Sequence, residues 1–113
     1  MNDILKQIDD VLEARKSDSP DSSYVASLYD KGIEKILKKV SEEAAETVMA
    51  AKDLEHSNGA QADQDHLVYE IADLWFHTMV LLASQNLSSN NVTAELQRRF
   101  GLSGHEEKAS RSE

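Results

Sequence analysis

Four carboxylates on two predicted helices are spaced so that together they could bind a metal ion. The stretch KKVSEEAAE, which begins at Lys38, contains Glu43 and Glu46 three residues apart. A later stretch, VYEIADLWFH, contains Glu70 and Asp73 at the same spacing. Residues three apart lie on one side of an α-helix, so each pair presents two carboxylates in one direction.

The two pairs are expected to lie level with each other. A short loop between two helices produces an antiparallel hairpin. Glu46 and Glu70 are equally far from Asn58 in the predicted loop, and so are Glu43 and Asp73. Four carboxylates that face one another cannot all stay ionised without a cation. Oxygen ligands in a chain without cysteine favour Mg²⁺ or Mn²⁺.

Ordinary surface charge is the alternative explanation for the first stretch. Lys38 with Glu42, and Lys39 with Glu43, are i,i+4 pairs of the kind found on any solvated helix. Asp73 fits that explanation less well, because apolar Leu, Trp and Phe follow it. A carboxylate in such surroundings costs free energy unless it is paired or binds a metal. On the residues alone, both interpretations stay open.

Helical periodicity identifies the elements that must position these groups. Apolar residues recur at helical spacing and strand-like alternation is absent, so an all-α fold is predicted. Long helices are expected over approximately 3–16, 31–54, 64–85 and 88–100, with a short helical turn over YVASLYDKG and a polar loop over 55–65. Asn2 or Asp3 is expected to cap the first helix, and Ser88 or Ser89 the last.

The two central helices each carry an apolar stripe that is expected to face the core. The earlier stripe comprises Ile33, Ile36, Leu37, Val40, Ala44, Thr47 and Ala51. The later stripe comprises Leu67, Ile71, Leu74, Trp75, Thr78, Leu81 and Leu82. A further apolar side of the later helix carries Phe76, Val80 and Ala83. Because one hairpin cannot cover both sides, we expect an antiparallel bundle that is completed by a homodimer or a higher oligomer.

Length, charge and composition bound the class of protein. The 113 residues predict a single domain over 1–100, followed by a disordered tail over 101–113. A net charge of -9 disfavours binding to nucleic acid. The apolar runs fall short of the ~20 residues that a membrane span needs, so no membrane partner is expected. Neither a secretory signal pattern nor cysteine is present, which favours a cytoplasmic protein.

Two long segments resemble a known enzyme family. They are SSYVASLYDKGIEKILKKVSEEAAETVMAAKD and HLVYEIADLWFHTMVLLASQNLSSNNVTAELQRR. Both are similar to the phosphoribosyl-ATP pyrophosphatases, within the all-α nucleotide pyrophosphohydrolases similar to MazG, whose shared pattern is Glu-x-x-Glu, a spacer and Glu-x-x-Asp. The strings SYVASL, KILKKV and VYEIADLWFH are much more specific to the phosphoribosyl-ATP branch. The resemblance implies Mg²⁺-dependent hydrolysis of phosphoribosyl-ATP to phosphoribosyl-AMP and pyrophosphate, the second step of histidine biosynthesis.

The resemblance also assigns roles to the acidic residues. It implies metal ligation by four side chains, which are Glu43, Glu46, Glu70 and Asp73. Glu42 matches the doubled glutamate of the family and is implied to be a further ligand or the base that activates water. Two departures from the family pattern are Ser41, where glycine is common, and a longer loop between the helices. No fused cyclohydrolase domain is expected in a chain of this length.

Several other side chains are candidates for contacts with substrate. Lys39 and Lys35 lie on one helix face and would neutralise phosphate oxygens, or would form only surface ion pairs. Tyr24 would contact substrate or anchor the connector. His77 would hydrogen-bond a ligand carboxylate or would be a buried structural side chain.

Two competing functions follow from the same sequence. The first is hydrolysis of other nucleoside triphosphates, including deoxynucleotides, by the same fold and chemistry. The second is a non-catalytic helical dimer that serves as an interaction module. Arg98 and Arg99 would reach a phosphate only from the last helix, and they are equally explained as exposed arginines without a specific role.

Overall fold

A computed structural model describes residues 3–101 as a set of helices joined by short turns. The elements are α1 (Ile4–Ala14), a 3-10 turn (Arg15–Ser17), α2 (Tyr24–Lys31), α3 (Ile33–His56), α4 (Gln61–Ser84) and α5 (Ser89–Phe100). Within 3–101 there is no strand, so the all-α prediction is confirmed. The short turn predicted over YVASLYDKG is the helix α2. Asn2 and the tail over 102–113 lie outside the described residues.

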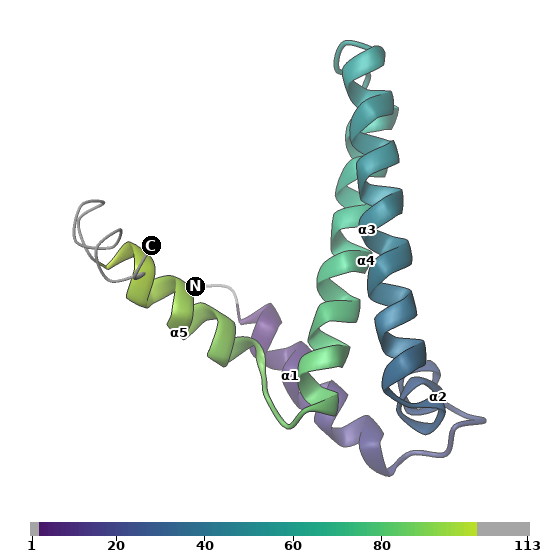
Figure 1. Ribbon diagram of the computed structural model, residues 1–113, viewed down its shortest axis with the longest axis vertical. Helices are drawn as coiled ribbons and strands as arrows, with labels where there is room; N and C mark the ends of the chain where they lie inside the picture. Colours follow the sequence, from purple (N-terminus) through teal and green to yellow (C-terminus); the bar gives the residue numbers. More distant parts are fainter. Residues whose placement is uncertain (1–2, 102–113) are drawn as a thin grey trace.

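The long antiparallel hairpin of α3 and α4 is the main feature of the fold (Figure 1). Its loop is Ser57–Ala60, where Asn58 and Gly59 have positive φ angles of 57° and 90°. Left-handed backbone at these positions ends α3 and reverses the chain. The loop predicted over 55–65 was too long. The first turn of α4 forms within it, because the Gln64 side chain donates a hydrogen bond to the carbonyl of Gly59 at 2.7 Å.

The apolar core lies at the end of the hairpin that is remote from this loop. There α1 and α2 pack beside α3 and α4 around seven buried side chains, which are Leu12, Val25, Leu28, Ile36, Met79, Val80 and Ala83. Gly32 joins α2 directly to α3 with φ 93° and ψ -177°, a conformation open almost only to glycine. Ser23 caps α2 by accepting a hydrogen bond from the amide of Ala26. The result is a fixed position for Tyr24, the first residue of α2.

The last helix, α5, points away from the hairpin and packs against α1 (Figure 1). Ser88 caps it in a capping box with Asn91, as the sequence predicts. Asp9 of α1 strengthens this junction, because its carboxylate accepts hydrogen bonds from the amide and the hydroxyl of Ser89. At the start of α1, Asp3 occupies the N-cap position that the sequence predicts, but its side chain makes no capping hydrogen bond.

The buried faces of α3 and α4 differ from the predicted stripes. In α3 the buried residues are Ile36, Glu43 and Ala50, whereas Ala44 and Ala51 are exposed. In α4 they are Glu70, His77, Met79, Val80 and Ala83, whereas Trp75 is 60% exposed. The predicted stripes are therefore only partly buried: Ile36 is buried and Leu74 half-buried, whereas Trp75 is exposed. An apolar stripe shows which side chains avoid water, but it does not show whether the same chain covers them.

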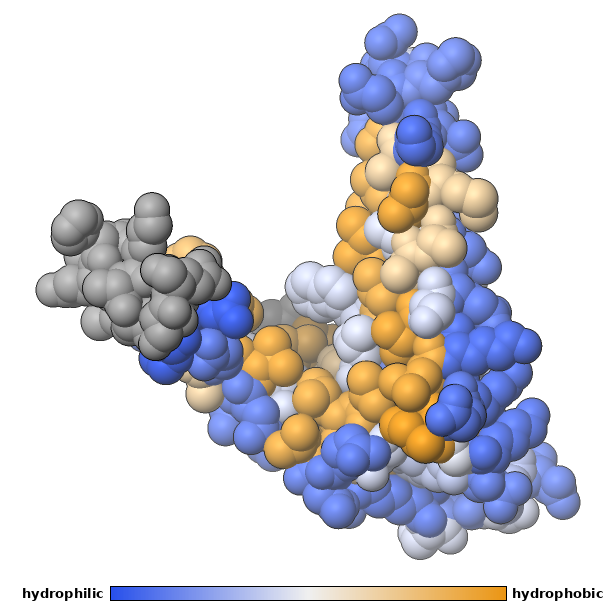
Figure 2. Space-filling view, in the orientation of Figure 1, coloured by the Kyte–Doolittle hydropathy of each residue, from blue (hydrophilic) through white to orange (hydrophobic). Residues whose placement is uncertain are grey.

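The side chains that stay exposed on the hairpin are also not the predicted ones. Val80 and Ala83 are buried within the chain, and Phe76 and Leu81 pack partly against the core. The large exposed apolar residues of the two long helices are Ile33, Leu37, Val48, Met49, Val68, Tyr69 and Trp75. Figure 2 shows apolar side chains running along the hairpin and around the angle that it makes with α5.

By length and composition alone, α4 is apolar enough to cross a membrane. The central helix of a water-soluble protein meets the same criterion. In this fold α4 packs along α3 and buries Glu70 and His77 at that contact. We therefore interpret α4 as the central helix of the hairpin.

Candidate metal and active site

Three of the predicted metal ligands meet between α3 and α4. One carboxylate oxygen from each of Glu43, Glu46 and Glu70 lies within 4.8 Å of the other two. Glu43 and Glu70 are only 5% and 7% exposed, and Glu46 is half-buried. The short loop brings the two helices together in the register that their spacing predicts, with Glu46 across from Glu70.

One oxygen of each buried carboxylate in this group lacks a hydrogen-bond partner. Oε2 of Glu43 and Oε1 of Glu70 are buried and accept no hydrogen bond. Burial raises the pKa of Glu43, and the charges of Glu46 and Asp73 raise this pKa further. His77 and Lys39 act in the opposite direction and lower the pKa of Glu43. Burying a carboxylate oxygen without a hydrogen-bond partner lowers the stability of the fold. The residues present therefore fit a hard cation, which would supply the missing partner.

Asp73 stands at the edge of this group. Its carboxylate is half-buried and does not belong to the set of oxygens within 4.8 Å. It is still near enough for its charge to raise the pKa of Glu43. Its backbone carbonyl, at 2.8 Å, accepts a hydrogen bond from Nδ1 of His77. Asp73 therefore contributes negative charge to the site from the next turn of α4.

His77 links α2 to the acidic group. A carbonyl can only accept, so the contact with Asp73 places a proton on Nδ1 of His77. In the neutral ring Nε2 then accepts from the hydroxyl of Tyr24, which lies 2.8 Å away. Burial raises the pKa of Tyr24, which keeps this hydroxyl protonated. His77 is 5% exposed, and its Nδ1 is 3.9 Å from Oε1 of Glu43.

Lys39 is the cation closest to the carboxylates of α3. Its ammonium group lies 3.7 Å from Oε2 of Glu42 and 3.8 Å from Oε1 of Glu43. Glu42 thus points to the Lys39 side of the helix and is not one of the three clustered carboxylates. Lys35 is half-buried one turn earlier and forms no ion pair with any residue between 3 and 101. Lys39 is also near Tyr24, because its charge lowers the pKa of Tyr24 while burial, the larger effect, raises it.

His66 is a further residue of the site, and it was not among the residues predicted from the sequence. Its Nε2 lies 3.2 Å from Oε2 of Glu70, one turn along α4. Both residues line a hollow of about 330 Å³ beside the carboxylates, together with Glu46, Met49, Ala50, Lys52 and Asp53. The i,i+4 spacing of His66 and Glu70 was visible in the sequence, but such pairs are common on helices. Only the burial of Glu70 makes this one stand out.

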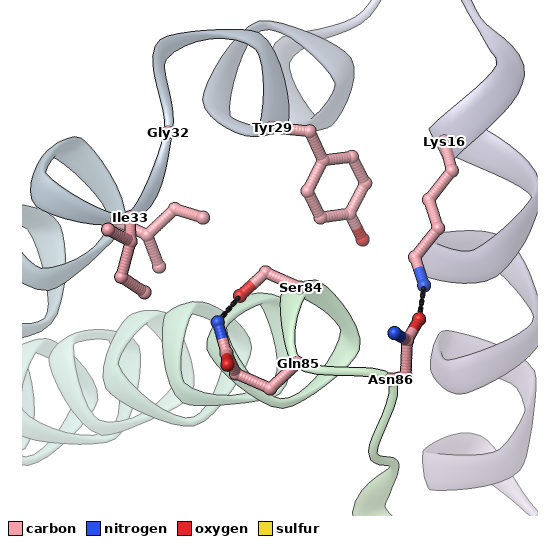
Figure 3. A pocket seen from close by; sticks show the side chains of 8 residues that line it. Lys16, Tyr29, Gly32, Ile33, Ser84, Gln85 and Asn86 are labelled. Atoms are coloured by element: carbon pink, nitrogen blue, oxygen red, sulfur yellow. Dashed lines mark hydrogen bonds between the residues drawn. The ribbon is translucent and has the colours of Figure 1, made fainter.

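A second hollow, also about 330 Å³, lies at the base of the fold, roughly two helical turns of α3 from Glu43. Figure 3 shows Lys16, Tyr29 and Asn86 around it, and the Lys16 ammonium donates to the Asn86 side chain at 3.1 Å. The predicted site residues do not line it. Arg98 and Arg99 both pair with Glu95 on α5, and this helix packs against α1.

Comparison with known proteins gives consistent matches over almost the whole chain. A family model described as phosphoribosyl-ATP pyrophosphohydrolase matches residues 5–100. A protein of Hydrogenovibrio crunogenus named phosphoribosyl-ATP pyrophosphatase is 67% identical over 98% of this chain and 95% of its own length. Proteins of the same name from Methylococcus capsulatus and Ruthia magnifica are 56% and 54% identical, over 96% and 99% of both chains.

Proposed function

This chain belongs to the phosphoribosyl-ATP pyrophosphohydrolase family, and we propose that it performs the reaction of that family at the carboxylate group between α3 and α4. The protein is an enzyme that hydrolyses phosphoribosyl-ATP to phosphoribosyl-AMP and pyrophosphate, the second step of histidine biosynthesis. The main support for this location of the active site is that Glu43 and Glu70, in a group of three carboxylates, each bury one oxygen without a hydrogen-bond partner.

Mg²⁺, or Mn²⁺ in its place, is the cofactor that we propose for this group. Glu43, Glu46 and Glu70 would hold the ion, and Asp73 would add a fourth carboxylate from the next turn. When bound, the ion would neutralise phosphate oxygens and lower the pKa of an attacking water. This choice is supported by the donor set, which is all oxygen, and by the absence of cysteine from the chain.

The remaining residues bind substrate and move protons. Glu42, beside the group and outside it, is proposed to accept the proton of the attacking water. Lys39 and Lys35 would bind phosphate oxygens, since they precede the carboxylates on α3 by one and two turns. Tyr24 would contact substrate at the mouth of the site, with His77 fixing its hydroxyl. His77 also supports Asp73 through the backbone carbonyl.

We also propose that the enzyme is a cytoplasmic homodimer, or a higher oligomer, that binds neither nucleic acid nor membrane. The support is the exposed apolar surface of the hairpin, where Val68 is 68% and Trp75 60% exposed. On α5, Val92, Leu96 and Phe100 are exposed as well. An isologous contact would bury one such patch against its copy. Light scattering at micromolar concentration tests this, and an active monomer would contradict it.

Pyrophosphate release from a panel of triphosphates, with and without Mg²⁺, tests the function. We expect release from phosphoribosyl-ATP only, and only with the metal. Glu46→Gln and Asp73→Asn should abolish this activity in a folded protein, whereas Glu55→Gln, an exposed carboxylate on the same helix as Glu46, should not. Turnover close to that of the wild type in both site variants would contradict the assignment.

A further inference from the structure

We propose that His66 is a positioning residue, which holds the Glu70 carboxylate in the orientation that leaves Oε1 free to bind the metal. This inference rests on the proposed metal site. The Nε2 atom of His66 lies 3.2 Å from Oε2 of Glu70, whereas Oε1 is buried and has no hydrogen-bond partner. The two oxygens of one carboxylate therefore have different surroundings.

The attraction in this contact follows from the chemistry of the two groups. An ionised carboxylate has no proton to donate, so a proton on Nε2 of His66 attracts Oε2 across the 3.2 Å that separates the two atoms. With Oε2 engaged, rotation of the carboxylate about its last bond would break that contact. Oε1, which is buried and has no partner, is thereby left available to an ion held with Glu43 and Glu46, since one oxygen of Glu70 lies within 4.8 Å of theirs. Partners that fix the orientation of a ligand in this way contribute strongly to metal affinity.

Burial separates this contact from an ordinary pair on a helix surface. The side chain of Glu70 is 9% exposed and that of His66 is 50% exposed. A half-exposed imidazole therefore contacts a buried carboxylate. The same helix contains a pair of equal spacing, in which Gln61 donates to Asp65 at 2.9 Å. Both of those residues are exposed, and Asp65 does not belong to the carboxylate group. Gln61 therefore provides a matched control for the loss of one i,i+4 side-chain contact from α4.

Binding of Mn²⁺ alone, without substrate, tests the proposal, and titration calorimetry of the full chain provides the measurement. We expect His66→Ala to weaken Mn²⁺ binding by about 10- to 100-fold. His66→Gln keeps an N–H donor, so its Mn²⁺ affinity should return to within about threefold of the wild type. Gln61→Ala should bind Mn²⁺ as the wild type does.

Two results would overturn the role of His66. One is a His66→Ala variant that binds Mn²⁺ as tightly as the wild type. The other is a His66→Gln variant that binds no better than His66→Ala, since the N–H donor would then be irrelevant. Glu46→Gln in the same series separates this failure from that of the site. If wild type and Glu46→Gln bind Mn²⁺ equally, the metal site itself is wrong, and the proposal for His66 falls with it.

Discussion

The base and the middle of the α3–α4 hairpin are equally buried, but their chemistry is opposite. On α3 the buried line runs through Ile36, Glu43 and Ala50. Ile36 is 1% exposed and packs in the apolar core, while Glu43, two turns further along, is 5% exposed and leaves Oε2 without a partner. The same face of α3 thus carries a well-packed apolar side chain at the base and a buried carboxylate oxygen without a hydrogen-bond partner in the middle.

The facing helix shows the same change. Near its end α4 contributes Met79, Val80 and Ala83 to the core, and earlier it buries Glu70 and His77 opposite Glu43. Burying a large apolar side chain stabilises the fold by about 1.5–3 kcal/mol. Burying a carboxylate without a partner destabilises it. The apolar base therefore holds in place a middle section that would not form by itself, and four predictions test this division.

The largest effect is expected from Glu43→Gln in the middle section. Loss of a charged ligand should reduce Mg²⁺-dependent pyrophosphate release by more than roughly 100-fold. This loss is larger than the one expected from residues that only hydrogen-bond to the ligands. The free energy of unfolding in EDTA should stay the same or rise, because a buried negative charge beside Glu46 and Asp73 is removed. Activity and urea unfolding are measured on the same sample. A destabilised variant that retains its activity would reverse the assignment of the two regions.

Ile36→Ala at the base should have the opposite profile. Removing a fully buried side chain is expected to lower the free energy of unfolding by about 2–5 kcal/mol. The turnover number per folded molecule should be retained at low temperature, since Ile36 lies outside the carboxylate group. Urea unfolding and the Mg²⁺ dependence of turnover are the measurements. A changed metal requirement would show that the base does more than support the site.

The register of the two helices, and hence the meeting of Glu43, Glu46 and Glu70, could be predicted from the sequence, whereas Asp73 lies at the edge of the predicted group. Spacing of three puts Glu43 with Glu46 on one helix face, and a turn at Asn58 sets the opposite helix level with it. The buried direction of each helix could not be predicted, because α4 is apolar on several sides and a sequence does not show which side its own chain covers. His66 was missed for a related reason, since its significance depends on the burial of Glu70.

The two regions should also respond differently to pH. The folded-state pKa of Glu43 is raised, mainly by burial, so between the unfolded and folded pKa values the folded chain binds more protons than the unfolded chain. Its contribution to stability is therefore fully present below the unfolded pKa, and it is lost as the pH rises through the folded pKa. In EDTA we expect wild type to lose stability across that window, with a smaller loss in Glu43→Gln. Ile36→Ala should keep the wild-type slope, and parallel curves for all three proteins would contradict this.

The smallest effect is expected where the two regions meet, at Tyr24. It begins α2, whose Val25 and Leu28 belong to the core, and its hydroxyl reaches His77 in the middle section. Tyr24→Phe removes that one hydrogen bond and keeps the ring, so the free energy of unfolding should fall by about 0.5–1.5 kcal/mol.

The kinetics of Tyr24→Phe then show which region the hydroxyl serves. Tyr24 is 51% exposed at the mouth of the site, so a direct contact with substrate should raise KM while metal affinity stays unchanged. If the hydroxyl acts only through His77, which bonds the carbonyl of Asp73, metal affinity should weaken as well. Unchanged KM and unchanged Mn²⁺ binding, alongside the loss of stability, would assign Tyr24 to the base and remove it from the site.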